Sequence, residues 1–513
     1  MQLHLHPASS SPNPERPSNL NMIHHSPVRL IFIRTCIVLL QYAPLIETTL
    51  LLGLLLTSSS RSYTTTVLSI LLLAELLFAI FIYLPHKSRI SDQAVHPPPL
   101  VRKEREALFE RCIANIPNWD RYLHLWFQYA DPSEIRRDNL RDFLLWAFFD
   151  SDNDTSDHDD ELAHYTRRVE AHLGRALLPG RGSAIPLRLT FDAIPVCYRS
   201  IIWYLIIALI DLLTHLTLHR HSFNHHSTPI PTKLFPPRAA ALNRHTSPTP
   251  LTYWHRPHRS KTHHPILFIH GIGIGLWPYT SFLADLDPTI GIIALELLPI
   301  SARLTHPPLS QADFLTHLST ILSAHPEWHR FVLVSHSYGS VLTTHILHSP
   351  LSPRVHGIVL VDPVSILLHL PDVAYNFTRR KPRTANEWQL WYFASMDVGV
   401  AEGLGRYFFW RENIVWKEEL TGDRRRRVAV CLAGRDLIVD TATVARYLMS
   451  EGDFNEEGEG FDGQAEGRYV GSGGIEVLWF PRLDHAQVFE EKRDWRRVGG
   501  VVERYCLKGD VLN

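Results

Sequence analysis

Two kinds of hydrophobic pattern divide the chain. Before residue 86 the apolar residues form long runs, whereas after His264 they form short runs separated by helical stretches such as Gln311–Ala324. The short runs are rich in Val and Ile: Ile266–Ile269, Ile290–Leu297, Phe331–Val334, Val355–Val361, Val428–Leu432 and Ile475–Phe480. Continuous apolar strands are buried on both faces, which is typical of a parallel sheet covered by helices. Residues 264–510 are therefore predicted to form a three-layer α/β domain.

The long runs predict a membrane anchor over residues 28–86, with one or two transmembrane helices. From Val67 to Leu84, 16 of 18 residues are hydrophobic, and the run extends back to Tyr63, which gives the length of about 20 residues that a spanning helix needs. The earlier stretch, about Leu30 to Leu56, is interrupted by Arg34, Gln41, Pro44 and Glu47. Charges are costly at the bilayer centre, so this stretch is predicted to be tilted, interfacial or paired with its neighbour. The alternative is a pair of buried soluble helices.

The basic residues around the anchor predict its orientation. Arg16 and Arg29 precede the first stretch, and Lys87, Arg89, Arg102 and Lys103 follow the second. Only Arg61 lies between them. By the positive-inside rule both ends face the cytosol, together with the predicted α/β domain. Residues 1–27 are rich in Ser, Pro, Asn and His and are predicted to be a disordered tail, and no cleavable signal peptide is recognised.

The segment 87–263 is predicted to be a helical and linker region. Residues 101–150 have amphipathic helical patterning with many aromatic residues, and residues 219–264 are loop-like. Ile201–Leu218 is a third apolar segment with 14 of 18 hydrophobic residues, and Asp211 and His215 share one helical face. This segment either packs in a cap or enters the membrane interface.

Composition excludes some classes of protein. The 513 residues contain 51 Lys+Arg and 52 Asp+Glu, a net charge of −1, which argues against nucleic-acid binding by bulk positive charge. Five scattered cysteines contain no CxxC pair and fit a reducing compartment. The 31 histidines are widely spread, and those near residue 260 lack partners at ligand spacing, so no metal site is expected. No cofactor motif is present, and the sequence does not specify an oligomeric state.

The strongest chemical motif is Ser335-His336-Ser337-Tyr338-Gly339. It follows the predicted strand Phe331–Val334 and precedes the helical stretch Ser340–His348. A strand–turn–helix corner with a central Ser between small residues is a nucleophile elbow. Ser335 replaces the usual first Gly, so the pattern is SxSxG. Ser337 is the predicted nucleophile.

A glycine-rich turn lies upstream of the elbow. The strand Ile266–Ile269 runs into His270-Gly271-Ile272-Gly273-Ile274-Gly275. An oxyanion hole needs backbone N–H groups of this kind, one from this loop, Ile272, and one from Tyr338 after the nucleophile. An ordinary glycine-rich turn and a nucleotide-binding loop are the alternatives. The spacing matches neither GxxxxGK[ST] nor GxGxxG.

An acid and a base follow two later strands. Asp436 ends the stretch Ala433-Gly434-Arg435-Asp436 that follows Val428–Leu432, with Asp440 as a competing acid, and His485 follows Ile475–Phe480. Asp484 is a further alternative partner for His485, although adjacent side chains usually point apart. The order Ser, Asp, His along the chain is the one found in α/β-hydrolases.

Residues from about 264 to 490 thus resemble the α/β-hydrolase family, and the whole chain resembles membrane-anchored, lipase-like fungal members. The resemblance implies an α/β-hydrolase fold with Ser337 as nucleophile, His485 as general base and Asp436 as its orienting acid. Epoxide hydrolases and haloalkane dehalogenases of this fold have Asp at the elbow. Ser337 therefore indicates an acyl-enzyme and the cleavage of an ester, thioester or amide, or acyl transfer.

The substrate class is suggested by an insertion of about residues 365–425, the usual lid position. Eleven of the 56 residues from Ser365 to Leu420 are aromatic, about twice the chain-wide 10%. An aromatic cap suits a long apolar acyl group, so a lipid-like ester at a membrane is the expected substrate. An acyltransferase or thioesterase of the same fold, or a catalytically silent membrane scaffold, is the alternative.

Overall fold

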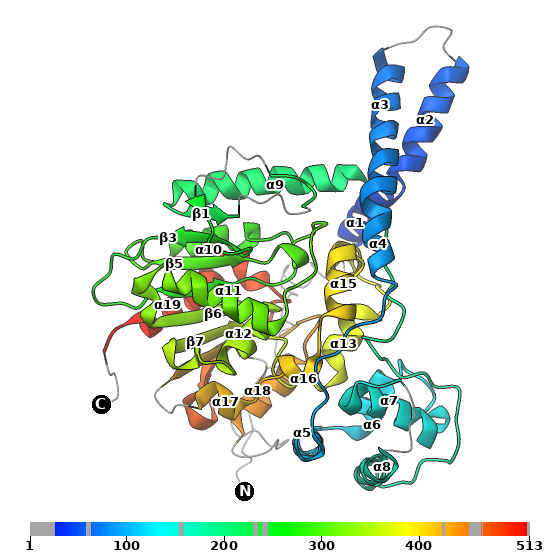
Figure 1. The fold of residues 1–513 in the computed structure, drawn as a ribbon, viewed down its shortest axis with the longest axis vertical. Helices are drawn as coiled ribbons and strands as arrows, with labels where there is room; N and C mark the ends of the chain where they lie inside the picture. Colours follow the sequence, from blue (N-terminus) through cyan, green and yellow to red (C-terminus); the bar gives the residue numbers. More distant parts are fainter. Residues whose placement is uncertain are drawn as a thin grey trace, which may run out of the picture.

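A ten-stranded, mostly parallel sheet organises the structure, a computed structural model (Figure 1). The structure describes residues 26–57, 63–152, 158–228, 234–238, 245–422, 426–450, 463 and 465–509. The strands are β1 (Asn224–Ser227), β2 (His245–Thr246), β3 (Thr252–Arg256), β4 (Ile266–Ile269), β5 (Ile292–Glu296), β6 (Phe331–His336), β7 (Val355–Val361), β8 (Arg427–Ala433), β9 (Gly467–Val470) and β10 (Glu476–Phe480). Their order is β2-β1-β3-β5-β4-β6-β7-β8-β10-β9. The run from β5 to β10 is parallel, which confirms the predicted fold class.

The sheet begins earlier in the chain than the predicted domain boundary at residue 264. Residues 219–264 were expected to be loop-like, but β3 pairs antiparallel with β5, and β1 pairs antiparallel with β3. Their residues are His, Asn, Thr, Tyr and Trp instead of a continuous run of Val and Ile, because these strands lie towards one edge of the sheet. The loop prediction for this segment was wrong.

Helices cover both faces of the sheet, and alternate strand residues supply the two cores. Ile266 and Phe268 of β4 pack with α10 (Thr280–Asp285) and α19 (Lys492–Cys506). Leu267 and Ile269 face the opposite core, with α11 (Gln311–Ser323), α12 (Gly339–Leu347) and α18 (Thr441–Met449). Two apolar faces on one strand are the reason for the continuous apolar runs in the sequence.

A helical cap lies over the carboxyl ends of the parallel strands (Figure 1). Between β7 and β8 it contains α13 (Pro371–Thr378), α14 (Ala385–Leu390), α15 (Val398–Arg406), α16 (Trp410–Asn413) and α17 (Lys417–Thr421). The earlier helices α5 (Arg102–Ala114), α6 (Trp119–Trp126), α7 (Arg137–Phe149) and α8 (Asp159–Leu173) join the same core, and α6 packs on α13. The region 101–190 is thus a second part of the cap.

The apolar helices gather at one end of the molecule. Helix α1 (Pro27–Gln41) meets α2 (Ala43–Thr57) at a bend of 69°. Helix α3 (Tyr63–Phe78) continues through a π-helical turn, Ala79–Tyr83, into α4 (Leu84–Arg89). The continuous helix Tyr63–Arg89 and helix α9 (Ile201–Arg220) are both long and apolar enough to cross a membrane, and the bent α1–α2 pair counts as a third candidate. The predicted tail lies outside the described residues except for Ser26, which caps α1, and Pro27, its first residue.

Candidate active site

The turn between β6 and α12 holds Ser337 in a strained backbone conformation. Its φ is 51°, in the left-handed region that residues with side chains seldom occupy, and its N–H donates to the Val361 carbonyl at 2.9 Å. Only a glycine fits at position 339, because a Cβ there would collide with the Ile269 carbonyl oxygen of the neighbouring strand. Strain at a tightly held corner is typical of a functional residue.

The structure explains why serine is accepted where the elbow motif usually has its first glycine. Ser335 is completely buried, and its hydroxyl accepts a hydrogen bond from the Thr343 hydroxyl on α12 at 2.8 Å. Burial of a hydroxyl that keeps a hydrogen-bond partner costs little free energy. The Ser335 side chain also ties the strand to the helix that follows Ser337.

The three residues predicted as a triad meet at the carboxyl end of the sheet. His485 Nε2 lies 2.8 Å from Ser337 Oγ, and His485 Nδ1 lies 2.6 Å from Asp436 Oδ2. The other Asp436 oxygen accepts the N–H groups of Ile438 and Val439, at 2.7 and 2.9 Å. These two bonds fix the carboxylate and leave Oδ2 to orient the imidazole.

The two competing carboxylates have other partners. Asp440 caps α18 and accepts the Thr443 N–H at 3.1 Å. Asp484 accepts the Leu437 N–H at 2.9 Å and the Asn386 amide at 3.0 Å. It also accepts the His485 backbone N–H at 2.7 Å, whereas the carboxylate oxygen 2.6 Å from the imidazole Nδ1 belongs to Asp436. The geometry therefore favours Asp436 as the acid that pairs with His485.

A second buried carboxylate, Asp362, was not recognised in the sequence analysis. Its two oxygens accept the backbone N–H groups of Ala433, at 2.9 Å, and Ala486, at 3.0 Å. It thereby links the segment before Asp436 to the residue after His485. The available signal was its position directly after β7, since the carboxyl ends of parallel strands meet at the site.

The charges of this cluster shift the pKa values of its members. Burial disfavours protonated His485, but Asp436 and, more weakly, Asp362 and Asp484 outweigh it and raise the pKa of His485 to about 9. Burial, with the neighbouring Asp436, raises the pKa of Asp362 to about 7. Carboxylate oxygens of Asp362 and Asp436 and a ring nitrogen of His485 lie within 4.8 Å of one another. Asp436 is hydrogen-bonded to the His485 ring, whereas Asp362 is held beside them by the backbone N–H groups of Ala433 and Ala486.

The glycine-rich turn after β4 is held by two buried side chains. Leu297 N–H donates to His270 Nε2 at 2.9 Å, so Nδ1 carries the proton and donates to the Gly271 carbonyl at 2.7 Å. Tyr279 OH accepts the Gly271 N–H at 3.3 Å and is hydrogen-bonded to His336 Nδ1 at 2.7 Å. Burial lowers the pKa of both histidines, which keeps these rings neutral. The turn is thus fastened to the end of β5 and to the elbow.

Glycine is required at position 271. A Cβ there would lie 2.8 Å from the Cβ of Ser337, so the turn can approach the nucleophile only without a side chain. Within the described part of the chain, neither the Ile272 nor the Tyr338 backbone N–H donates to another residue. Both amides belong to residues that line the same cavity as Ser337, which leaves them available to a ligand.

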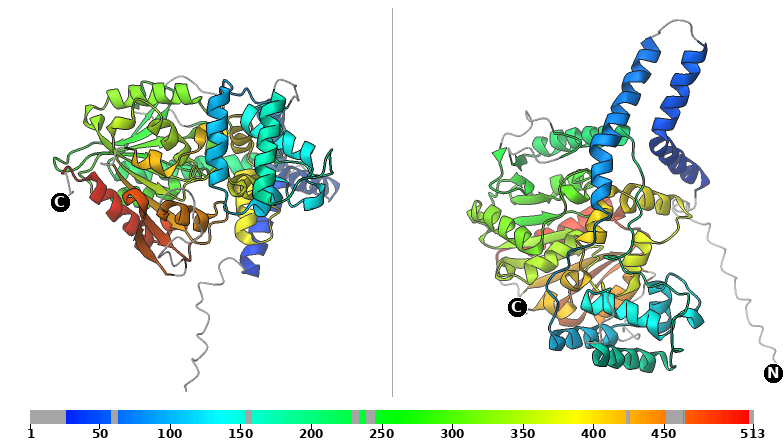
Figure 2. Two further views of the ribbon diagram at one scale, coloured as in Figure 1. Left: turned by 90° about the horizontal axis from the view of Figure 1, so that it is seen from below. Right: turned by 45° about the vertical axis from the view of Figure 1, so that its right-hand side comes forward.

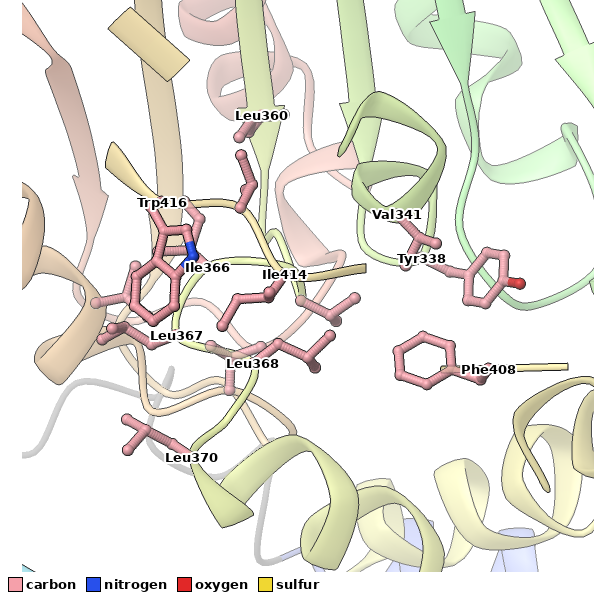
Figure 3. Packing of buried hydrophobic residues seen from close by; sticks show 14 of the residues in the cluster. Tyr338, Val341, Leu360, Ile366, Leu367, Leu368, Leu370, Phe408, Ile414 and Trp416 are labelled. Carbon is pink, nitrogen blue, oxygen red and sulfur yellow. The ribbon is translucent and has the colours of Figure 1, made fainter. Parts of the chain in front are cut away.

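An apolar cavity opens beside Ser337. Phe377, Leu404 and Phe408 line it from the cap, and Trp126 and Trp146 line it from α6 and α7. Tyr338 and Phe408 lie close together at its wall, with ring centroids 6.1 Å apart. Figure 3 shows this pair on one side of the buried cluster, with Ile366, Leu367 and Leu368 on the side towards Trp416. The two tryptophans were predicted only as part of an amphipathic helical region. Their place at the site depends on the packing of α6 against α13.

Comparison with known proteins adds a family match. A family model described as the alpha/beta hydrolase family matches residues 266–496. No curated protein matches the chain.

Several solved structures are similar to part of the chain. A bacterial membrane phospholipase A is 11% identical, with a TM-score of 0.36, over 60% of this chain and 94% of its own. A thermophilic esterase from Thermogutta terrifontis is 10% identical, with a TM-score of 0.34, over 51% and 96%. A carboxylesterase from Nitrososphaera gargenis is 14% identical, with a TM-score of 0.33, over 50% and 97%.

Proposed function

Residues 266–496 form a domain of the α/β-hydrolase family, and on that basis we propose that the protein is a membrane-anchored serine hydrolase that cleaves carboxylic esters of lipids. The observation that carries the proposal is the chain of contacts from Ser337 Oγ through His485 to Asp436, at 2.8 and 2.6 Å. A nucleophile, a base in reach of its proton and an acid that orients the base are what acyl transfer through a serine requires.

The reaction proceeds in two halves. Ser337 Oγ attacks the ester carbonyl and gives its proton to His485 Nε2, while the Ile272 and Tyr338 amides hydrogen-bond the developing oxyanion. His485 then protonates the departing alcohol, which leaves an acyl group on Ser337. Water attacks this acyl-enzyme, His485 takes the water proton and returns it to Ser337 Oγ, and the carboxylic acid leaves.

The cavity supports a long apolar acyl group. Its lining beside Ser337 is almost entirely aliphatic and aromatic, which is the usual lining of a site for an apolar ligand. Charged or sugar-like acyl groups would lose their hydration there without gaining polar partners.

The apolar helices support membrane anchoring beside this cavity. Arg89, at the end of the long helix Tyr63–Arg89, forms an ion pair with Glu402 on α15 at 2.8 Å. Helix α15 also carries Leu404, which lines the cavity. The anchor and the acyl site are thus joined through one cap helix. The excess of basic residues on both sides of the anchor favours a cytosolic catalytic domain.

Labelling with a fluorophosphonate probe tests the proposal. The full-length protein is expected to react, and Ser337→Ala and His485→Ala are expected to lose labelling. Two exposed residues away from the site, Ser323 on α11 and His164 on α8, provide matched controls as Ser323→Ala and His164→Ala. Absence of labelling in the wild type, under conditions in which a control lipase reacts, would overturn the proposal.

A further inference from the structure

Helix α9 has two opposite faces of different character. One face is apolar and exposed, with each residue between 37% and 58% accessible: Ile202, Leu205, Ile206, Leu209, Leu212, Leu213 and Leu216. Their spacing is that of one stripe along a helix. The opposite face is buried against the domain and includes Tyr204, Ile207 and Leu218. A continuous exposed stripe of this kind marks a surface that another apolar phase covers.

The polar residue in the middle of α9 fastens the helix to the hydrolase domain. The Asp211 carboxylate is paired with the guanidinium of Arg303, whose side chain is completely buried, and lies 3.5 Å from Arg238. If α9 left the domain to cross a bilayer, Asp211 would go with it and the buried Arg303 would lose its partner, which is strongly unfavourable.

Both ends of α9 are also attached to the body. Tyr204 packs against Phe78 of α3 and against Phe235, with ring centroids 5.2 and 5.4 Å apart. At the other end Leu218 belongs to the core beneath the sheet, and β1 begins four residues after the helix ends. A helix attached at its middle and at both ends cannot cross a bilayer without leaving the domain.

Glu75 joins α9 to the apolar hairpin formed by α2 and α3. Its carboxylate accepts the Ile201 N–H and the Ser200 hydroxyl, each at 3.0 Å, at the first turn of α9. The twelve residues of α3 from Tyr63 to Ala74 lie beyond the contact between Glu75 and α9. At 1.5 Å per residue they have a length of about 18 Å. Figure 1 and the right-hand view of Figure 2 show the hairpin projecting from the rest of the protein, with α9 lying crosswise at the base of the hairpin. The apolar stripe of α9 therefore continues into the surface of the hairpin.

We infer that α9 is not a transmembrane helix but lies in the plane of the membrane interface, with its leucine stripe among the lipid acyl chains. The inference rests on the membrane anchoring proposed above, and it commits to lipid as the partner because the stripe is continuous with the hairpin. Helices with one apolar and one protein-bound or polar face lie in this way at the boundary of headgroups and acyl chains. The hydrolase domain is thus held against the bilayer along the whole length of α9.

Depth-dependent fluorescence quenching tests this arrangement in the full chain. The two partly exposed cysteines, Cys36 and Cys197, are replaced by Ala, and Leu205→Cys, Leu209→Cys and Leu213→Cys are labelled singly with an environment-sensitive dye. The proteins are reconstituted in phosphatidylcholine–phosphatidylserine vesicles with a quencher at a shallow or a deep acyl position, or with iodide in the water. All three sites are side chains exposed at the surface of the fold, and circular dichroism before reconstitution verifies the fold of each variant.

The dyes at the three positions are expected to be quenched to the same extent by the shallow lipid quencher and only weakly by iodide. In a spanning helix Leu205 and Leu213 would differ in depth by about 12 Å, and such a gradient would overturn the inference. Strong iodide quenching at all three positions would overturn it too.

Two reference positions separate this result from a failure of the anchor. Ile70→Cys on α3 is expected to be quenched by the deep lipid quencher, and the exposed Arg167→Cys on α8, at the far end of the molecule, by iodide. If the dye at position 70 is quenched by the lipid quencher while the dyes on α9 are quenched by iodide, only the inference on α9 fails. If Ile70 reports water, the proposed membrane anchoring fails with it.

Discussion

Asp362 accepts a hydrogen bond from the backbone N–H of Ala486 at 3.0 Å, so a buried carboxylate holds the residue next to His485. The second oxygen of Asp362 holds Ala433 in the same way, at 2.9 Å. Ala486 has a φ of 68° and Asp362 itself a φ of 44°, so both residues occupy conformations that need support. The loops that carry the acid and the base are thus fixed from one point.

The pH dependence of the wild type follows from the state of His485. Only a neutral imidazole can take the Ser337 proton, and the surrounding carboxylates raise the pKa of His485 to about 9. The rate of fluorophosphonate labelling is therefore expected to fall as the pH falls through about 9. A midpoint near the ordinary histidine value of about 6.5 would contradict this electrostatic description.

Replacement of Asp362 by Asn is expected to lower the midpoint of the pH dependence of fluorophosphonate labelling. The negative charge of Asp362 contributes to the raised pKa of His485, so its loss makes the imidazole easier to deprotonate. The amide also loses one of the two acceptor positions, and the labelling rate at high pH is expected to fall. A lower rate with an unchanged midpoint would show that Asp362 has only a structural role.

The choice between the two candidate acids is tested by a matched pair of variants. Asp436→Asn removes the acceptor that fixes the tautomer of His485, and a loss of about 10⁴ in kcat is expected. Asp440→Asn leaves a good cap on α18, so kcat is expected to remain close to that of the wild type. Steady-state turnover of a soluble ester measures both. A larger loss in Asp440→Asn than in Asp436→Asn would reverse the assignment.

Narrowing of the cavity is expected to change the preference for acyl length. Ala374 on α13 lines the cavity beside Ser337, and a phenyl ring there would occupy the space of several methylene groups. Ala374→Phe is expected to reduce turnover of a palmitoyl ester at least tenfold relative to an acetyl ester. This factor corresponds to a loss of about 1.4 kcal/mol in the binding of the palmitoyl group relative to the acetyl group. Ala163→Phe, on the exposed face of α8, is the control. Equal losses for both esters would argue against this cavity as the acyl site.

Much of the hydrolase domain could be predicted because its signals are local. The continuous apolar strands, the Ser337 elbow and the residues after β8 and β10 are each recognisable in a few consecutive residues. Their meeting at one edge follows from the parallel sheet, since its strands all end on the same side.

The parts that escaped prediction depend on long-range packing. Strands β1 and β3 have no continuous apolar run, because they pair with the sheet near its edge and contain His and Thr. Asp362 acquires its role only when β7, β8 and β10 are side by side. Trp126 reaches the cavity because α6 packs on α13, more than 200 residues away in the sequence, and Trp146 of α7 lies beside it with ring centroids 5.5 Å apart.

Detection of the acyl-enzyme tests the central claim most directly. The full-length protein is mixed with a palmitoyl nitrophenyl ester, quenched in acid within the first turnover, digested and examined by mass spectrometry. The account predicts a palmitoyl adduct on the peptide that contains Ser337, and neither an adduct nor turnover in Ser337→Ala. A stable adduct on another residue, or turnover by Ser337→Ala at the wild-type rate, would contradict it.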